Sequence, residues 1–214
     1  MTAERGVESE TGRVVRQLRD EILDGARKPG SKLVERDLAA DLGVSRVPVR
    51  DALKTLVAEG LVMPRPRTWA VVREFTASDI ADLQEVRAAL EVLTFKLAAT
   101  RHTRAGLDRL RAALDEETAA AEADDPVTAH RAAADFHQAV TALAGNDLLN
   151  ELELTLRSRM RWLLGQHEDL ARVAAEHRAL YDAIARRDVD TVEALLLEHM
   201  ESGRHLRGLG RGED

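Results

Sequence analysis

The sequence predicts a mainly α-helical protein in two parts: an N-terminal part of three short helices and a small β-hairpin, then an antiparallel bundle of about six helices. Three observations predict this fold. The apolar content of 44% is mostly Ala, Leu and Val, and aromatic residues make up only 3%, which favours helices over a sandwich or barrel. A glycine turn separates two amphipathic segments before residue 60. From residue 77 onward, apolar residues recur at helical spacing almost without interruption.

Composition and charge exclude several classes of protein. The 214 residues include no cysteine, which excludes disulfides, thiolate metal sites and thiol catalysis. No apolar run reaches the roughly 18 residues of a membrane span, and the charged N-terminus does not resemble a secretory signal, so we expect a cytoplasmic protein. The net charge of -7 is uneven: +2 over 1–74, -9 over 75–214, and +5 within 27–73. The asymmetry predicts two domains, 1–74 and 75–214, with different partners.

The N-terminal domain is predicted to be a winged helix-turn-helix. Its helices are expected at 14–25, 34–43 and 46–60, with a turn at 28–33 and the hairpin at 61–75. Gly43 ends the second helix, and Ser45 stands at the N-cap position of the third. Pro48 falls in the first turn of that helix, where its missing N–H costs little. Two helices joined by a short glycine turn and followed by a hairpin are typical of this fold.

The start of the third helix carries a pattern that suits duplex DNA. If its apolar residues face the core, Arg46 and Arg50 lie one turn apart on the exposed side. Arginine pairs bidentately with guanine O6 and N7, and Val47 fits a thymine methyl. Ser45 and the helix N-terminus suit a phosphate. The two arginines alone would indicate only a solvated helix, but the whole ordered set favours a helix that enters the major groove.

The C-terminal domain is predicted to be an all-helical antiparallel bundle, because short breaks separate its helices. The expected helices cover 77–101, 104–123, 126–144, 147–167, 169–186 and 188–206.

Three histidines lie on apolar faces of separate helices in this bundle: His137, His177 and His199. A single buried histidine is usually a hydrogen-bonded core residue. Three on facing helices are able to converge on one metal ion. Spacing alone does not decide between these two interpretations.

At this point the sequence resembles a known family. The stretch "GARKPGSKLVERDLAADLGVSRVPVRDALKTLVAEGLV" resembles the N-terminal signature of the GntR family of bacterial transcription regulators. The segments "LQEVRAALE", "DFHQAVTALAGNDLL" and "EHRALYDAIARRDVDTVEALLLEHM" resemble the FCD ligand-binding domain of its FadR subfamily. The resemblance implies a homodimeric regulator, more commonly a repressor, that binds a palindromic operator and responds to a small-molecule effector.

The resemblance also assigns DNA contacts. It places three arginines and a serine against DNA: Arg36, Arg46, Arg50 and Ser45. It implies a minor-groove contact by the wing, where Arg65 and Arg67 are able to reach phosphates. Trp69 stands where relatives usually have glycine, which makes the wing of this chain a departure from the family pattern.

Many FCD domains hold a divalent cation through one Asp and three His, and the three histidines match. The Asp position, four residues before His137, is Ala133, and Asp135 points about 200° around the helix. The resemblance therefore implies a three-histidine site with open positions. Nitrogen ligands favour Zn or Ni over Mg or Ca.

A carboxylate effector would then supply the missing oxygen. Arg87 is similar to an Arg that faces the ligand in relatives and would pair with that carboxylate; the alternative is a surface ion pair with Glu91. Two other functions stay open at this point: a metal-dependent enzyme that uses the three histidines, and a regulator that responds to an organic acid without metal.

Overall fold

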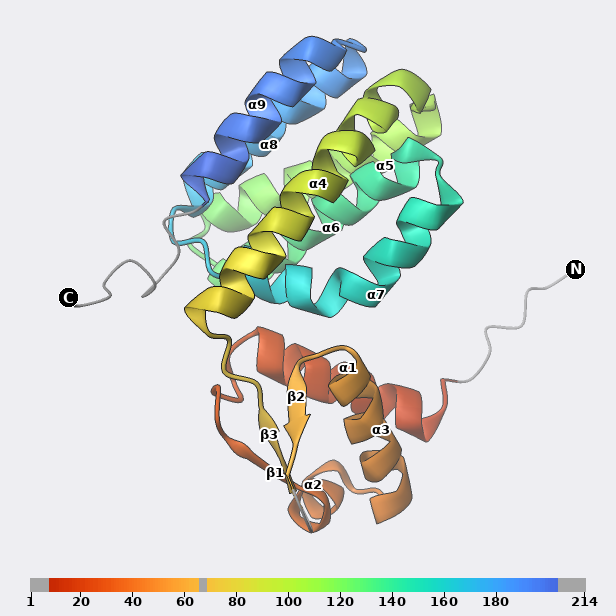
Figure 1. Cartoon of the computed structure of the whole chain (residues 1–214), viewed down its shortest axis with the longest axis vertical. Coiled ribbons are helices and arrows are strands. Elements are labelled where there is room, and N and C mark those ends of the chain that lie inside the picture. The colour runs from red at the N-terminus through yellow and green to blue at the C-terminus, as the bar shows by residue number, and fades with distance from the viewer. Residues whose placement is uncertain (1–7, 66–68, 204–214) are drawn as a thin grey trace, which may run out of the picture. The chain divides into compact units, whose positions relative to one another are not determined.

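The fold is mainly helical with one small sheet, as the sequence predicts (Figure 1). This computed structural model describes residues 8–65 and 69–203. The chain divides into two compact units, Met1–Phe75 and Thr76–Asp214. Within the described residues, none of the helices combines the length and apolarity that crossing a bilayer requires.

The N-terminal unit contains three helices around a three-stranded antiparallel sheet of order β1-β3-β2. Its elements are α1 (Glu10–Leu23), β1 (Lys32–Val34), α2 (Glu35–Leu42), α3 (Arg46–Ala58), β2 (Val62–Pro64) and β3 (Trp69–Val72). Helices and sheet meet in a buried core that includes Leu18, Leu33, Val49 and Leu56. The arrangement is the predicted winged helix-turn-helix.

Strand β1 corrects the sequence prediction. Residues 28–33 were expected to form a turn and Val34 to begin a helix, whereas Lys32–Val34 is a strand in which Leu33 pairs with Ala70 of β3. Three residues are too short for a periodic pattern, and their partner lies far along the chain. Helix α1 also begins earlier than predicted, because the side chain of Ser9 caps it by accepting a hydrogen bond from the N–H of Gly12.

The turn between α2 and α3 follows the predicted chemistry. Gly43 has φ of 63° and ends α2 in the left-handed region, where glycine avoids the steric cost of a Cβ. Ser45 is the N-cap residue of α3, but its side chain makes no capping hydrogen bond. The hydroxyl of Ser45 is exposed, and no capping hydrogen bond would compete with a partner outside the protein.

The second unit contains the six predicted helices. They are α4 (Ala77–Arg101), α5 (Arg104–Glu122), α6 (Pro126–Ala144), α7 (Asp147–Leu164), α8 (Leu170–Ala185) and α9 (Val189–Ser202). Each begins after a residue whose side chain accepts a hydrogen bond from the first turn: Thr76, Thr103, Asp125, Asn146, Asp169 and Asp188. These caps stabilise helix starts that the apolar spacing alone does not fix. Helix α7 ends at Leu164, before the predicted residue 167.

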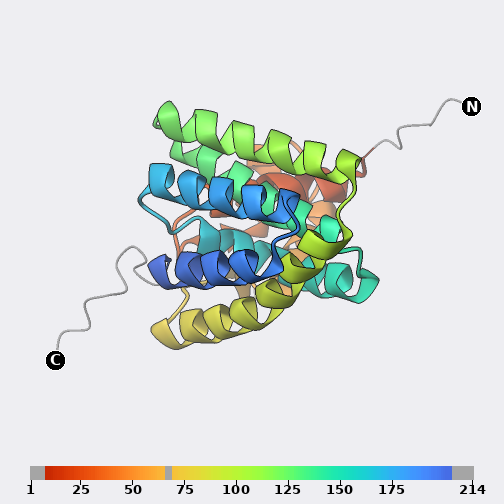
Figure 2. The ribbon, with the colours of Figure 1, turned by 90° about the horizontal axis from the view of Figure 1, so that it is seen from above.

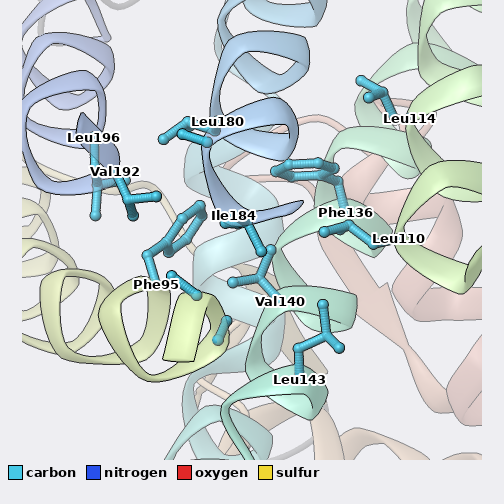
Figure 3. Close-up of a cluster of buried hydrophobic side chains, with 13 residues drawn as sticks. Phe95, Leu110, Leu114, Phe136, Val140, Leu143, Leu180, Ile184, Val192 and Leu196 are labelled. Carbon is cyan, nitrogen blue, oxygen red and sulfur yellow. The ribbon is translucent and has the colours of Figure 1, made fainter. Parts of the chain in front are cut away.

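One apolar core joins α4, α5, α6, α8 and α9. Phe95 of α4, Val140 of α6, Ile184 of α8 and Val192 of α9 point toward one another (Figure 3). Helices α8 and α9 run side by side in both ribbon views (Figures 1 and 2). The three histidines adjoin this core, since the ring of Phe136 stacks on His177 with centroids 4.4 Å apart. The core therefore forms a rigid apolar wall for the polar cluster described below.

Candidate DNA interface and histidine cluster

The start of α3 presents three side chains to solvent. Packing determines this, because Val49, Ala52 and Leu56 occupy the buried face of the helix. Arg46 and Arg50 keep 60% and 51% of their side-chain area exposed. Val47, between them, is 65% exposed. This part of the helix therefore offers one apolar side chain, Val47, between two guanidinium groups that donate hydrogen bonds.

A carboxylate that sequence reasoning missed holds the two guanidiniums. Glu35, the first residue of α2, accepts hydrogen bonds at Oε1 from Nε of Arg50, at 3.0 Å, and at Oε2 from Nη2 of Arg50, at 2.9 Å. Its Oε2 also accepts from Nη2 of Arg46, at 3.2 Å. The hydrogen bond from Arg50 outweighs partial burial and lowers the pKa of Glu35. No sequence signal pointed to this carboxylate, since eleven residues separate Glu35 from Arg46.

The other residues expected at DNA lie apart from this group. Arg36 is highly exposed, and its Nε donates to Oδ1 of neighbouring Asp37 at 3.0 Å. Arg65 is exposed just after β2. Arg67 lies outside the described residues. The backbone of Trp69 belongs to β3, opposite Val34, so this position continues the sheet.

In the helical unit, the three predicted histidines come together. His137 of α6, His177 of α8 and His199 of α9 are buried, and one ligand nitrogen from each lies within 4.8 Å of the others. The Nε2 atoms of His137 and His177 are 3.2 Å apart. Two nitrogens bound to one tetrahedral zinc ion at about 2.05 Å would be separated by roughly 3.3 Å. The spacing of this pair therefore fits a shared metal ion.

Each of the three rings has a glutamate at Nδ1. Glu91 lies 2.9 Å from Nδ1 of His137, and Glu117 lies 2.7 Å from Nδ1 of His177. Glu176 lies 2.6 Å from Nδ1 of His199. A carboxylate at Nδ1 orients an imidazole and directs its Nε2 toward a metal, an arrangement typical of histidine metal sites.

Arg87 lies inside this cluster and not on the surface. Its side chain is 6% exposed, and its Nε is 3.0 Å from Oε2 of Glu91. Its Nη2 lies 3.1 Å from Nε2 of His199. Arg87 therefore pairs with Glu91, as one of the two interpretations predicted, but the pair is buried beside the histidines and not at the surface.

Burial and charge determine the protonation of these groups. Burial opposes ionisation of Glu91, but the positive charge of Arg87, with His137 also in contact, outweighs it and lowers the pKa of this carboxyl. Burial raises the pKa of Glu117 to about 8 and lowers that of His177. At neutral pH Glu91 is therefore charged beside Arg87, whereas Glu117 and His177 are neutral.

One assignment of protons fits the hydrogen bonds around His177 and His199. Protonated Glu117 donates to Nδ1 of His177, whose Nε2–H then donates to Nε2 of His137. Arg87 donates to Nε2 of His199, whose Nδ1–H donates to Glu176, whereas Nδ1 of His137 lies 2.9 Å from Glu91 without the geometry of a hydrogen bond. Neutral imidazoles are the form that binds metal.

The remaining candidates stay outside the ligand set. Ala133, at the usual Asp position, is buried, and Asp135 is exposed. His130 instead contacts the backbone oxygen of His167 at 2.9 Å.

Sequence reasoning also missed His167, which follows α7 and is buried with its ring 6.3 Å from that of His199. Within the described residues its Nε2 has no hydrogen-bond partner, and burial lowers its pKa to about 3. Glu117 did carry a sequence signal, because it shares the helical face of buried Leu110 and Leu114.

The fold belongs to one class of protein. The model "Bacterial regulatory proteins, gntR family" matches residues 10–72, and "FCD domain" matches residues 82–202. The chain therefore belongs to the GntR family of bacterial regulatory proteins and carries an FCD domain. It is a transcription regulator and not an enzyme, so the alternative of a metal-dependent enzyme is wrong.

Curated relatives carry consistent descriptions. The chain is 32% identical to the HTH-type transcriptional regulator LutR of Bacillus subtilis, over 84% of this chain and 92% of that protein. It is 29% identical to a probable D-xylose utilization operon transcriptional repressor of Paenarthrobacter nicotinovorans, over 87% of this chain and 85% of the other.

Solved structures agree with the fold. A putative GntR regulator from Rhodococcus sp. RHA1 is 29% identical, with a TM-score of 0.79 over 94% of this chain and 99% of that one. Escherichia coli McbR/YncC is 25% identical, with a TM-score of 0.81 over 92% and 96%.

Proposed function

We propose that this regulator is a cytoplasmic repressor that binds a palindromic operator as a homodimer and responds to a small carboxylate effector at the histidine cluster. The observation that carries the DNA part is the exposed group Arg46, Val47 and Arg50 at the start of α3. A helix end of this kind fits the major groove, with guanine at the arginines and a thymine methyl at the valine. The phosphate backbone of the DNA is contacted by Ser45, Arg36, Arg65 and Arg67.

The histidine cluster fits a divalent transition metal. His137, His177 and His199 would hold the ion through Nε2, with Glu91, Glu117 and Glu176 at the opposite ring nitrogens. An all-nitrogen set favours Zn or Ni. When bound, such an ion offers open coordination positions to an anionic oxygen. Because Ala133 provides no carboxylate, the effector provides that oxygen.

Arg87 is the second anchor for the effector. Nη2 of this guanidinium lies 3.1 Å from Nε2 of His199, which is the atom that would bind metal. Because metal at this nitrogen would replace the hydrogen bond from Arg87, that donor would be left for the effector. A buried, charged and newly available guanidinium pairs strongly with a carboxylate.

The homodimer uses α4 and α7. These two helices contact each other, and they carry most of the exposed large apolar residues of the described chain: Val86, Leu93, Leu148, Leu152 and Leu154. Half-buried Leu90 and Leu97 extend the α4 row at positions 86, 90, 93 and 97. This three-and-four spacing is that of a helix that packs against another helix.

DNA binding is tested with duplexes that the wild-type protein enriches from a random-sequence pool. We expect Arg46→Ala and Arg50→Ala each to weaken binding to an enriched duplex about tenfold at fixed salt. Arg111→Ala, an exposed arginine of α5 paired with Asp115, is the control and leaves affinity unchanged. Wild-type affinity in both α3 variants would contradict the proposed interface.

Metal binding is tested by calorimetric titration of chelator-treated protein with Zn²⁺ and Ni²⁺. We expect one site per chain, lost in His177→Ala and retained in His130→Ala, because His130 lies outside the cluster. Equal heats for wild type and His177→Ala would end the metal assignment and favour a regulator that binds an organic acid through Arg87 alone.

A further inference from the structure

Glu35 makes contacts that DNA binding by exposed arginines does not require. It lies at the first turn of α2 and reaches across to α3, where it accepts hydrogen bonds from both Arg46 and Arg50. Its side chain is 19% exposed, while the arginines are 60% and 51% exposed. The carboxylate is therefore less accessible to solvent than either guanidinium.

The guanidinium edges that bond to Glu35 determine which N–H groups of the two arginines are left for DNA. A guanidinium is planar and carries five N–H groups in fixed directions. Arg50 bonds to Glu35 with the edge formed by Nε and Nη2. Its other edge, formed by Nη1 and the second hydrogen of Nη2, stays available for the O6 and N7 atoms of guanine. Among the described residues, Arg46 bonds to Glu35 only through Nη2, which leaves its Nε and Nη1 for DNA.

The same carboxylate has a second effect on DNA. A negative charge beside two DNA-facing cations partly cancels their attraction for phosphates, which is the force behind sequence-independent binding. Fixed arginine planes favour bases that match them. Orientation and charge thus act in the same direction, toward discrimination between sequences.

We propose that Glu35 is a positioning residue for DNA recognition, which fixes the planes of Arg46 and Arg50 for base contacts and weakens binding to DNA of any other sequence. The inference rests on the proposed role of Arg46 and Arg50. It predicts that removal of the Glu35 charge lowers specificity without lowering non-specific affinity, a combination that mere unfolding of the domain does not produce.

The test compares Glu35→Gln with Asp37→Asn. Asp37 is a second acid in the first turn of α2, is 55% exposed, and pairs with Arg36. Affinities are measured at one salt concentration for an enriched duplex and for a duplex of scrambled sequence. Thermal unfolding of both variants confirms that they fold.

We expect Glu35→Gln to lower the ratio of specific to non-specific affinity about tenfold, the value of one well-placed bidentate contact, while its affinity for the scrambled duplex stays equal or rises. Asp37→Asn raises both affinities together and keeps the ratio. In an Arg46→Ala/Arg50→Ala background, Glu35→Gln no longer changes the ratio, since no arginine remains to position.

Different results overturn the positioning role of Glu35 and the proposed DNA interface. An unchanged ratio in Glu35→Gln, with both affinities raised as in Asp37→Asn, overturns the positioning role alone. Failure of the wild type to enrich any sequence, or wild-type affinity in the arginine variants, overturns the proposed interface itself.

Discussion

At the scale of single residues, carboxylates determine the character of both sites. Glu35 accepts hydrogen bonds from two arginines, and three glutamates each meet one histidine of the cluster. In the cluster, each carboxylate lies at Nδ1 of its histidine, while the other ring nitrogen, Nε2, is the one that would bind metal. The absence of the usual Asp, replaced by Ala133, therefore does not leave the cluster without negative charge.

Glu117 tests whether a carboxyl behind a histidine supports metal binding. Its carboxyl is almost fully buried and lies 2.7 Å from Nδ1 of His177. We expect Glu117→Gln to weaken Zn²⁺ binding about ten- to a hundredfold, because an amide stabilises the metal-bound imidazole less than a carboxylate does. Calorimetric titration measures the change.

The neighbouring residue is the control for Glu117. Glu116 is exposed on the same helix turn, so Glu116→Gln makes the same change of side chain without a contact to the histidine. An equal loss of affinity in both variants would indicate a long-range charge effect and not orientation of His177.

At the scale of elements, helix ends and close packing fix where the functional side chains stand. All six helices of the FCD domain start at a side-chain cap, and α5 lies close to α6, which carries His137. Gly106 lies where these two helices approach, and a Cβ added there would overlap a side-chain methyl of buried Leu143.

Substitution of Gly106 by Ala is therefore expected to destabilise the protein. Ala gains about 0.5–1 kcal/mol over Gly from helix propensity, but forced overpacking costs about 1–3 kcal/mol. We expect a net loss of about 1 kcal/mol, seen as a decrease of about 2–4 °C in the thermal midpoint.

Gly12 is a matched control for Gly106. Both glycines stand three residues after a capping side chain and donate their N–H to it. A Cβ at Gly12 would meet only the side chains of Ser9 and Glu8, so Gly12→Ala should be neutral or stabilising. A decrease in thermal midpoint of the same size in both variants would refute the packing explanation.

At the scale of the whole molecule, the two units differ in charge as they differ in role. The region 27–73, which contains α3, has a net charge of +5, while residues 75–214 carry -9. An acidic FCD domain is repelled by phosphates, so the field of the protein favours approach to DNA by the winged unit. Two such units on one dimer would read two half-sites.

Dimerisation through α4 and α7 is tested by charge insertion. We expect Leu93→Glu combined with Leu152→Glu to convert the protein from dimer to monomer in sedimentation equilibrium, because two carboxylates would be buried in an apolar contact. Affinity for an enriched palindromic duplex should fall by about a hundredfold or more, since the second half-site contact is no longer intramolecular.

Leu197→Glu on α9 is the control, because Leu197 is 52% exposed and outside the two helices. Loss of the dimer in this variant, with the double variant still dimeric, would place the interface on α9.

The sequence by itself determined what depends on neighbours within a helical turn. The nine helices of the described chain follow from apolar spacing and from caps such as Thr76 and Asn146. The outward position of Arg46 and Arg50 follows from the same periodicity. The histidines were identified because each interrupts an apolar face.

Only the tertiary structure decided the contacts between elements. Glu176 precedes His177 in sequence but pairs with His199, and His177 pairs with Glu117 sixty residues away. Arg87 meets His199 across 112 residues, and strand β1 exists because β3 lies beside it. Local periodicity sets which face of a helix is buried, but the choice of partner across that face depends on how the helices pack.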